Sequence, residues 1–253
     1  MKKQTKTLLL LCLSLTLAVS LIGCAPSTED AWQKIKNAGV ITVGTSPDYP
    51  PFETVDDDGK IIGFDIDLLT AMAAEMGVDV EFKPMNFDTI VTAVQSGQID
   101  IGMSGFSVDP ERDVEFSDSY YSGGQVLLTT ADSGVTGVKD LDGKTVAVQM
   151  ATTGEKAAKT ILGANVKALD DFAVAILMLK NGTAKAVVAD QAVAKQYVHH
   201  DGLVIVGEPL TVEENAIVVK KGNTEVLEAV NEALAKVKAS EKYEELLEKW
   251  AIK

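Results

Sequence analysis

Short apolar runs of four or five residues alternate along this chain with longer segments that are apolar on one side only. The short runs have the length of buried strands, and the longer segments repeat their apolar positions at helical spacing. Strands that alternate with helices indicate an α/β fold. The predicted strands are 40–43, 61–64, 78–82 and 99–103 and, after Gly123, 126–130, 145–148, 166–169, 186–189 and 203–206.

Helices are predicted between these strands, and the residue types at their ends mark where they start and stop. The ranges are 66–76, 88–96, 153–162, 171–180 and 191–199. Asp65 is expected to cap the first helix, and Gly77 and Gly97 are expected to end the first and the second. The stretch Asp-Asp-Asp-Gly at 56–59 is typical of a turn.

The chain carries one internal similarity. A helix, Gly97, a strand and the pair Ser104-Gly105 are repeated 85 residues later as a helix, Gly182, a strand and Ala189-Asp190. Either both halves are built from the same βαβ unit, or two ordinary βαβ units resemble each other by chance. In the first case each half places polar residues at the carboxyl end of a strand, where open α/β sheets bind ligands.

The stretch IGMSGFSVDPERDVEFS at 101–117 combines a strand end, a loop rich in Ser and Gly, and a signal for a helix start. Asp109 is a favourable N-cap and Pro110 suits the first helical position, which would make Arg112 the third helical residue. An arginine beside free backbone N–H groups and the hydroxyls of Ser104 and Ser107 would form a receptor for a planar carboxylate. The alternative is that Arg112 pairs with neighbouring acidic residues on a solvated face.

The N-terminus has the pattern of a lipoprotein signal peptide. Three lysines precede an apolar run of 15 residues at 8–22, which is too short to span a membrane. The run ends in Leu21-Ile22-Gly23-Cys24, which resembles a lipobox whose cysteine receives diacylglycerol; a chance cysteine is the alternative. Two acyl chains on Cys24 would anchor the mature chain stably.

Cleavage before Cys24 would leave a strongly acidic chain without a free thiol. Cys12 lies in the removed segment, and lipidation would consume Cys24. The loss of three lysines and no acidic residue changes the formal charge from −14 to −17. An acidic surface repels phosphate backbones, so nucleic-acid binding through a basic patch is not expected.

Several motifs follow one another from about Gly39 to Trp250. They are GTSPDYPPFE (44–53), GFDIDLL (63–69), FDTIVTAVQSGQID (87–100), SGFSVDPER (104–112), FSDSYY (116–121), DLDGKTVAVQ (140–149), TTGE (152–155) and YEELLEKW (243–250). In these motifs the chain resembles the polar amino-acid-binding proteins of ABC importers, the bacterial extracellular solute-binding proteins of family 3. The ordered set is far more specific than any one motif.

The resemblance implies a type II periplasmic-binding-protein fold, a two-lobed clamshell. Each lobe would be a sheet built from βαβ units with flanking helices, and two segments near 123–125 and 214–216 would form the hinge. A helix at 226–237 would return the chain to lobe 1. The expected division is a signal peptide at 1–23, a lipidated tether at 24–37, lobe 1 at 38–123 plus 216–253, and lobe 2 at 124–215.

The resemblance also implies a ligand site shared by both lobes. Arg112 matches the arginine that holds the α-carboxylate of the ligand, and Asp190 matches the carboxylate that accepts the α-ammonium. Ser104, Gly105 and Ser107 would assist Arg112. A carboxylate at the end of an apolar strand is unfavourable unless it is paired, so the cap of the following helix is the other interpretation of Asp190.

Five further residues match positions around the ligand. Tyr49 and Phe87 would pack on the ligand side chain, and Gln149 would contact it. Thr152 and Thr153 would reach the carboxylate when the lobes close. The residues alone leave other interpretations open, because Tyr49 fits a loop packed on prolines, Phe87 a core, and Thr152 a capping box.

Two positions depart from the family's pattern. Ser46 stands where many relatives have an acidic residue that meets the ligand side chain, and Asp48 is a candidate substitute. Ala151 replaces the glycine that relatives usually carry before the threonine pair, a change that would narrow the pocket or tilt its loop. Specificity for arginine or lysine therefore stays open.

The function expected from this resemblance is that of a monomeric, extracytoplasmic substrate-binding lipoprotein that closes on a polar L-amino acid and delivers it to an ABC permease. The alternatives are a dehydratase-like enzyme on the same scaffold, similar to cyclohexadienyl dehydratase, and a sensory amino-acid-binding domain. No cofactor motif or metal-ligand spacing is found in the sequence. The histidines, His199 and His200, follow a polar helix end, where a solvated position is expected.

Overall fold

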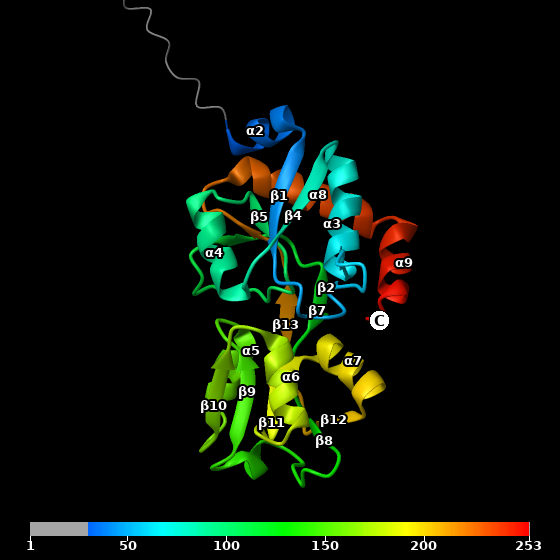
Figure 1. Ribbon diagram of the computed structural model, residues 1–253. Coiled ribbons are helices and arrows are strands. Elements are labelled where there is room, and N and C mark those ends of the chain that lie inside the picture. Colours follow the sequence, from blue (N-terminus) through cyan, green and yellow to red (C-terminus); the bar gives the residue numbers. More distant parts are fainter. Residues whose placement is uncertain (1–29, 253) are drawn as a thin grey trace, which may run out of the picture. The chain divides into compact units, whose positions relative to one another are not determined.

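The computed structural model describes residues 30–252, except for the side chains of His199 and His200. The expected signal peptide and Cys24 lie outside the described residues. Within the described range, no helix is both long and apolar enough to cross a membrane. From Ala31 onward the chain forms two five-stranded sheets, each with its own helices (Figure 1).

Lobe 1 contains the sheet with strand order β4-β1-β5-β14-β6. Its strands are β4 (Asp79–Pro84), β1 (Val40–Thr45), β5 (Ile101–Gly102), β14 (Val218–Val219) and β6 (Glu115–Phe116). Its helices are α2 (Ala31–Ala38), α3 (Phe64–Met76), α4 (Phe87–Ser96), α8 (Thr224–Lys238) and α9 (Glu241–Lys249). A short hairpin is formed by β2 (Thr54–Val55) and β3 (Ile61–Ile62).

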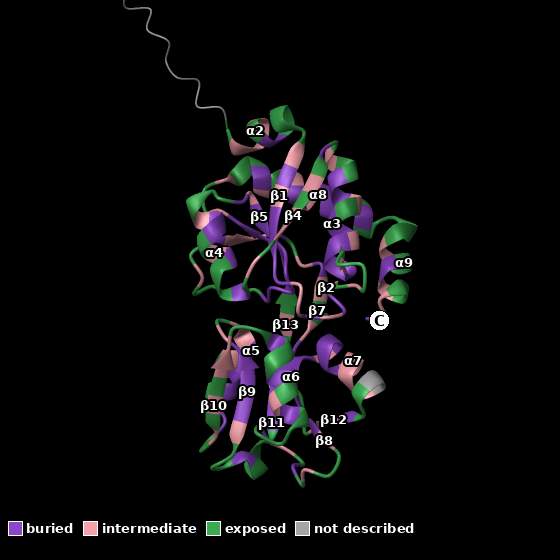
Figure 2. Ribbon diagram, in the orientation of Figure 1, coloured by how far each residue is buried: buried purple, intermediate pink, exposed green. Residues whose placement is uncertain are grey.

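Lobe 2 contains the sheet with strand order β10-β9-β11-β8-β12. Its strands are β10 (Asn165–Leu169), β9 (Thr145–Gln149), β11 (Ala186–Asp190), β8 (Gln125–Thr130) and β12 (Leu203–Val206). Its helices are α5 (Thr153–Lys159), α6 (Phe172–Lys180) and α7 (Gln191–Asp201), with a 3₁₀ turn, η1, at Val138–Leu141. Strand β11 is buried along its whole length, and β9 is buried at all but its first residue (Figure 2).

The two sheets share one topology. In lobe 1, the three strands β4, β1 and β5 are parallel, and β14 pairs antiparallel with β5. In lobe 2, the three strands β10, β9 and β11 are parallel, and β8 pairs antiparallel with β11. The segments α4–β5 and α6–β11 are the ones that the sequence similarity relates. Gly97 and Gly182 follow these helices with φ of 74° and 78°. Both segments are therefore βαβ units of the same topology, as both interpretations of the sequence similarity expect.

Two antiparallel segments connect the lobes. Strand β7 (Tyr121–Gly123) pairs with β13 (Glu213–Asn215), so that Ser122 lies opposite Glu214. These segments adjoin the predicted hinge positions. Because the chain crosses twice, the strand β14 that follows β13 returns to the sheet of lobe 1. Helix α8 then packs against α3, as expected for the C-terminal helix.

Three local predictions are wrong. Helix α3 begins at Phe64 after Gly63, and Asp65 is a buried residue of its first turn instead of its cap. This early start also ends strand β3 at Ile62. The expected tether overlaps helix α2, which buries Ile35 and packs on α8, so an apolar face holds these residues on lobe 1.

Candidate functional site

One narrow cavity between the lobes brings together all ten residues expected at the site. Its lining consists of Tyr49, Glu53, Phe87, Ser104, Gly105, Ser107, Arg112, Gln149, Thr152, Thr153 and Asp190. Glu53 is the one residue of this lining that the sequence analysis did not single out. The cavity volume is about 10 Å³, roughly the space that a single water molecule needs. A larger solute requires the walls to move apart.

Arg112 reaches the cavity from a turn and not from a helix, which corrects the predicted helix start at Asp109. The Asp109 carboxylate accepts a hydrogen bond from the backbone N–H of Glu111 at 3.2 Å. The backbone carbonyl of Asp109 accepts one from the backbone N–H of Arg112 at 3.0 Å. Strand β6 begins at Glu115 and pairs with β14, so the chain has no room for a helix. Turns and helix starts use the same residue types, and the sheet decides between them.

The side chain of Arg112, the only arginine of the chain, is 11% exposed. Its guanidinium carbon lies 5.4 Å from the ring centre of Phe87 and 5.1 Å from that of Phe106. Burial lowers the pKa of Arg112, and the Asp109 carboxylate, 3.5 Å from Nε, opposes this shift. Nη2 donates to the carbonyl of Ala151 in lobe 2 at 2.7 Å. These contacts fix the direction of a buried cation.

Asp190 lies on the opposite wall, at the end of β11, and is 4% exposed. Its Oδ2 accepts the Tyr49 hydroxyl at 2.9 Å and Gln125 Nε2 at 3.2 Å, whereas Oδ1 has no hydrogen-bond partner. Asp190 occupies the N-cap position of α7, but its side chain makes no capping hydrogen bond, so capping does not compensate the buried carboxylate. Burial raises the pKa of Asp190 to about 7, although the Tyr49 hydroxyl opposes the shift. A cationic group in the cavity would satisfy the unpartnered oxygen.

Tyr49 and Gln149 connect the lobes. The Tyr49 hydroxyl also accepts the backbone N–H of Asp190 at 3.0 Å, and its ring meets Phe172 edge to face at 4.7 Å. Gln149 Nε2 donates to Asp48 Oδ2 at 2.9 Å, and the backbone N–H of Phe172 donates to the same oxygen at 2.7 Å. Asp48 of lobe 1 therefore binds the amino end of α6 in lobe 2 and is not part of the cavity lining.

Ser104 and Gly105 lie at the cavity, but their donors are directed to two buried acids. Ser104 Oγ donates to Glu53 Oε1 at 3.0 Å, and the Gly105 N–H donates to Asp65 Oδ2 at 2.8 Å. Neither donor is therefore free for a ligand carboxylate. Asp65 was expected only as a helix cap, and Glu53 was not expected at the site. Glu53 is the last residue of the motif GTSPDYPPFE, but spacing along the chain does not indicate its contact with Ser104.

The threonine pair begins helix α5 at the lobe 2 wall. Thr152 Oγ1 accepts the N–H of Glu155 at 3.0 Å, as a capping box requires, but the Glu155 carboxylate accepts the N–H of Ala151 at 2.7 Å. The Thr153 hydroxyl donates to Glu213 at 2.7 Å. Ala151 has a φ of 58°, in the left-handed region that favours glycine. The second hydrogen bond of the predicted capping box is thus displaced by one residue, from Thr152 to Ala151. The backbone at Ala151 is strained because alanine stands where a glycine would fit.

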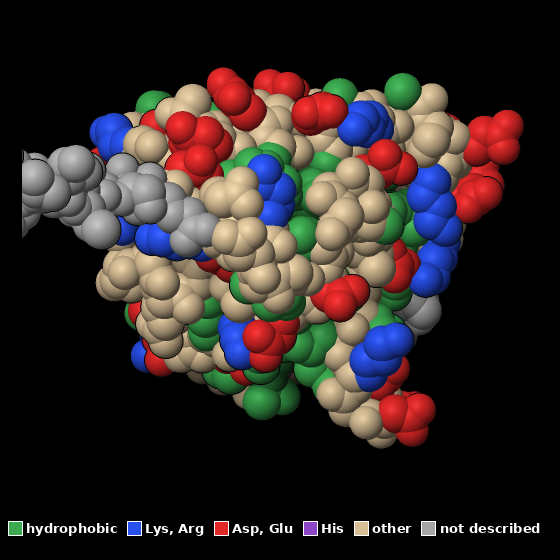
Figure 3. Space-filling model, turned by 90° about the horizontal axis from the view of Figure 1, so that it is seen from above, with side chains coloured by type: hydrophobic (Ala, Val, Ile, Leu, Met, Phe, Trp, Pro, Cys, Tyr) green, Lys and Arg blue, Asp and Glu red, His purple; other side chains and the backbone are tan. Residues whose placement is uncertain are grey.

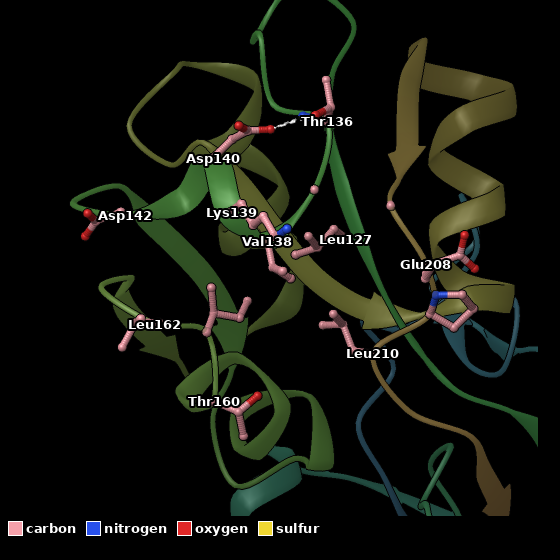
Figure 4. A pocket seen from close by; sticks show the side chains of 14 residues that line it. Leu127, Thr136, Val138, Lys139, Asp140, Asp142, Thr160, Leu162, Glu208 and Leu210 are labelled. Atoms are coloured by element: carbon pink, nitrogen blue, oxygen red, sulfur yellow. Dashed lines mark hydrogen bonds between the residues drawn. The ribbon is translucent and has the colours of Figure 1, made fainter.

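A larger hollow of about 940 Å³ lies wholly within lobe 2 (Figure 4). Leu127, Val138 and Leu210 point into it. Its charged lining residues are all exposed, and it contains none of the expected site residues. The smaller cavity between the lobes is the better candidate site, because its charged groups are buried and hold fixed directions.

The lining of the site carries one cation, Arg112, and two carboxyl groups, Asp190 and Glu53. Arg112 in lobe 1 and Asp190 in lobe 2 together complement the two charges of an α-amino acid. In the described part of the chain, no three or more His, Cys, Asp and Glu side chains are grouped to hold a metal ion. On the face shown in Figure 3, acidic side chains are spread over the surface with basic side chains between them.

Two sheets of common topology, a paired two-strand connection and a cavity between the lobes define a two-lobed binding-protein clamshell. The chain matches the model of "Bacterial extracellular solute-binding proteins, family 3" over residues 41–253. It is 31% identical over 252 residues to the arginine-binding extracellular protein ArtP of Bacillus subtilis, covering 96% of this chain and 96% of ArtP. The chain therefore belongs to family 3 of the bacterial extracellular solute-binding proteins.

Solved structures show the same relationship. A mutant of the arginine-binding protein ArgBP from T. maritima has a TM-score of 0.83 and 41% identity, covering 88% of this chain and 100% of that one. The ancestral amino-acid-binding protein AncCDT-1, described as a precursor of cyclohexadienyl dehydratase, has a TM-score of 0.83 and 38% identity. That match covers 87% of this chain and 99% of the ancestral one.

Proposed function

We propose that this chain is the substrate-binding protein of an ABC importer and captures a polar L-amino acid between its two lobes. Membership of family 3 and relatives named for arginine, cystine and histidine support an amino-acid ligand. The N-terminal pattern supports anchoring through Cys24 at the outer face of the cell membrane. The loaded monomer would then dock on a membrane permease.

The observation that carries the proposal is the position of Arg112 and Asp190 on facing walls of one cavity. Arg112 would hold the α-carboxylate, and Asp190 would accept the α-ammonium through the oxygen that has no partner. Ser107, Thr152 and Thr153 would complete the polar lining. Tyr49, Phe87 and Gln149 would contact the ligand side chain, and Ser104 and Gly105 would shape the wall through their backbone.

Closure follows from differential affinity. A zwitterion that contacts both lobes binds the closed form more tightly than the open form, and this difference drives the hinge. The cavity volume of about 10 Å³ means that the ligand enters while the lobes are further apart. Contacts between the lobes, such as Asp48 with Gln149 and Phe172, would form again around the bound ligand.

A dehydratase-like activity is the second candidate, supported by the match to AncCDT-1 and by two buried carboxyl groups at the cavity. An elimination needs a positioned general acid or base, and a carboxyl group with a raised pKa can serve as one. The pKa of Asp190 is raised to about 7 by burial. Prephenate is therefore included in the ligand screen as the probe for an elimination.

A thermal-shift screen tests both candidates. The purified full chain is measured with the twenty amino acids, ornithine, citrulline and prephenate, and the screen is repeated with Arg112→Ala. Lys139→Ala, which removes an exposed cation of lobe 2, is the control. A ligand at 1,000 times its Kd stabilises the folded state by about 4 kcal/mol. A shift with α-amino acids that Arg112→Ala loses and Lys139→Ala keeps is expected. No shift with any amino acid, or turnover of prephenate, would contradict amino-acid transport.

A further inference from the structure

Two buried acids, Glu53 and Asp65, lie behind the loop of Ser104 and Gly105 and have no role in the proposed ligand contacts. Both residues are 0% exposed. Glu53 lies directly before β2 and lines the cavity between the lobes, and Asp65 is in the first turn of α3. Carboxylates are almost never fully buried without compensation, so this pair requires a physical explanation.

Three donors satisfy one oxygen of each acid. Ser104 Oγ donates to Glu53 Oε1 at 3.0 Å. The Gly105 N–H and the Tyr120 hydroxyl donate to Asp65 Oδ2 at 2.8 Å and 2.9 Å. The two acids therefore hold two successive residues of the cavity wall.

The other oxygen of each acid has no donor. Glu53 Oε2 and Asp65 Oδ1 are both buried without a hydrogen-bond partner. The two carboxyl groups are neighbours, because each one shifts the pKa of the other. Two ionised carboxylates can only accept, and they repel at such a distance. A single proton shared by the two carboxyl groups would supply the missing donor and would remove one of the two negative charges.

The surrounding donors indicate which acid carries the proton. Asp65 accepts two hydrogen bonds that stabilise its anion, whereas Glu53 accepts one. Burial and the neighbouring Asp65 raise the pKa of Glu53 well above its usual value, and burial raises that of Asp65 to about 7. The other titratable groups acting on the pair are Asp48, from the loop after β1, and the Tyr120 hydroxyl; neither is a cation.

We propose that Glu53 donates a shared proton to Asp65 and that this pair positions the wall of the amino-acid site formed by Ser104 and Gly105. The consequence for binding rests on the proposed function. With Glu53 neutral, the charged groups of the cavity lining are Arg112 and Asp190, one of each sign, as a zwitterion requires. An ionised Glu53 would add a second anion to the lining.

Two substitutions of Glu53 distinguish the effect of its hydrogen bonds from the effect of its side-chain volume. In Glu53→Gln, the amide oxygen can accept from Ser104 and the amide N–H can donate to Asp65, so both hydrogen bonds survive without a titrating proton. In Glu53→Leu, a side chain of similar size makes neither bond and leaves Ser104 and Asp65 unsatisfied. Glu53→Gln is therefore expected to keep ligand binding, and Glu53→Leu is expected to lose it.

Infrared difference spectroscopy of the full chain tests the proton without any ligand. At pH 8 the wild type is expected to show the carbonyl band of a protonated carboxylic acid, and Glu53→Gln is expected to lack it. Asp190→Asn should keep the band, which excludes Asp190 as its source. Absence of the band in the wild type, or its persistence in Glu53→Gln, would overturn the proposal.

Calorimetry with L-arginine and, separately, L-glutamine tests the positioning role. Glu53→Gln should bind within about threefold of the wild type, and Glu53→Leu at least about tenfold more weakly. Equal binding by Glu53→Leu and the wild type would overturn the positioning role. If Glu53→Leu does not fold, the infrared spectra of the wild type and Glu53→Gln still decide whether Glu53 carries the proton. If the wild type binds neither of the two, the amino acid with the largest thermal shift replaces them. If no amino acid gives a shift, the proposed function fails, while the infrared result still decides whether the pair shares a proton.

Discussion

Lobes 1 and 2 have the same strand order but place different chemistry at the carboxyl ends of their strands. In lobe 1, the loop after β5 has its hydroxyl and N–H donors satisfied by buried acids, and the charged group of its wall is Arg112. In lobe 2, β11 ends directly in Asp190, one oxygen of which is left without a partner. The common topology thus brings strand ends together, and the terminal residues decide what the site can bind.

The largest effect is expected from removing the cation of lobe 1. Arg112→Ala should weaken amino-acid binding by about 10²- to 10³-fold, because it leaves a ligand carboxylate buried without its partner. Calorimetry against the wild type measures this loss. Lys139→Ala, which removes an exposed cation from lobe 2, should bind like the wild type. Equal amino-acid affinities of Arg112→Ala and the wild type would contradict the assignment of the ligand carboxylate to lobe 1.

Each lobe also has a buried acid that should make stability depend on pH. The pKa values of Asp65 and Asp190 are raised by burial to about 7 from an ordinary 3.8. Between these values the folded state holds protons that the unfolded state has lost. Their stabilising contribution is therefore complete below pH 3.8 and lost as the pH rises through about 7.

Urea unfolding between pH 5 and pH 8 measures this dependence. The free energy of unfolding should fall by a few kcal/mol over the range, and the slope should be smaller in Asp190→Asn. Asp57→Asn, a change at an exposed turn of lobe 1, serves as the control and should keep the wild-type slope. A slope that Asp190→Asn leaves unchanged would mean that Asp190 does not titrate in this range.

The acid of lobe 2 should also make ligand affinity depend on pH. A ligand ammonium needs ionised Asp190, so affinity should fall by up to about tenfold for each pH unit below about 7, with release of a proton on binding. Calorimetry in buffers of different ionisation enthalpy detects that proton. In Asp190→Asn binding is weaker and this dependence disappears. Constant wild-type affinity between pH 5.5 and 7 would argue against the ammonium contact.

A smaller effect is expected from the contact that joins lobe 1 to α6. Asp48→Ala removes the acceptor for Gln149 and for the Phe172 N–H, so the closed form loses stability and amino-acid affinity falls by about tenfold. Small-angle scattering without ligand should give a larger radius of gyration than for the wild type. Asp57→Ala is the control for loss of one acid. An unchanged radius and affinity would show that closure does not depend on Asp48.

The smallest effect concerns the strained loop of lobe 2. Ala151 has a φ of 58°, so Ala151→Gly should relieve local strain and stabilise the fold by up to about 1 kcal/mol. The change in Tm measures the gain. Ala158→Gly, in helix α5, should instead lower Tm. A lower Tm for Ala151→Gly would show that the loss of chain entropy exceeds the strain.

Regular elements were largely predictable because their signals are local. The pattern predicted β1 and β8, and Gly77 ends α3 with a left-handed φ of 73°, as expected. Asp109 and Asp65 show the limit of such signals. A sequence of Asp, Pro and Glu suits both a turn and a helix start, and only the pairing of β6 with β14 decides between them.

The candidate site was predictable where one residue ends a strand and less so where distant segments meet. The ten expected residues do line one cavity, although their role in binding stays a prediction. Glu53 was missed because its partner Asp65 is supplied by α3, and no spacing relates the two. Asp48 was considered as a ligand contact, but its partners Gln149 and Phe172 belong to the other lobe.

The most direct test of the account compares an amino acid with its amide. Calorimetry would use the amino acid with the largest thermal shift and the corresponding carboxamide, which keeps the ammonium but lacks the carboxylate. The wild type should bind the amino acid at least about 100-fold more tightly, and Arg112→Ala should hardly discriminate between the two. Discrimination by Arg112→Ala that equals the wild type would contradict the claim that the ligand carboxylate is held by lobe 1 through Arg112.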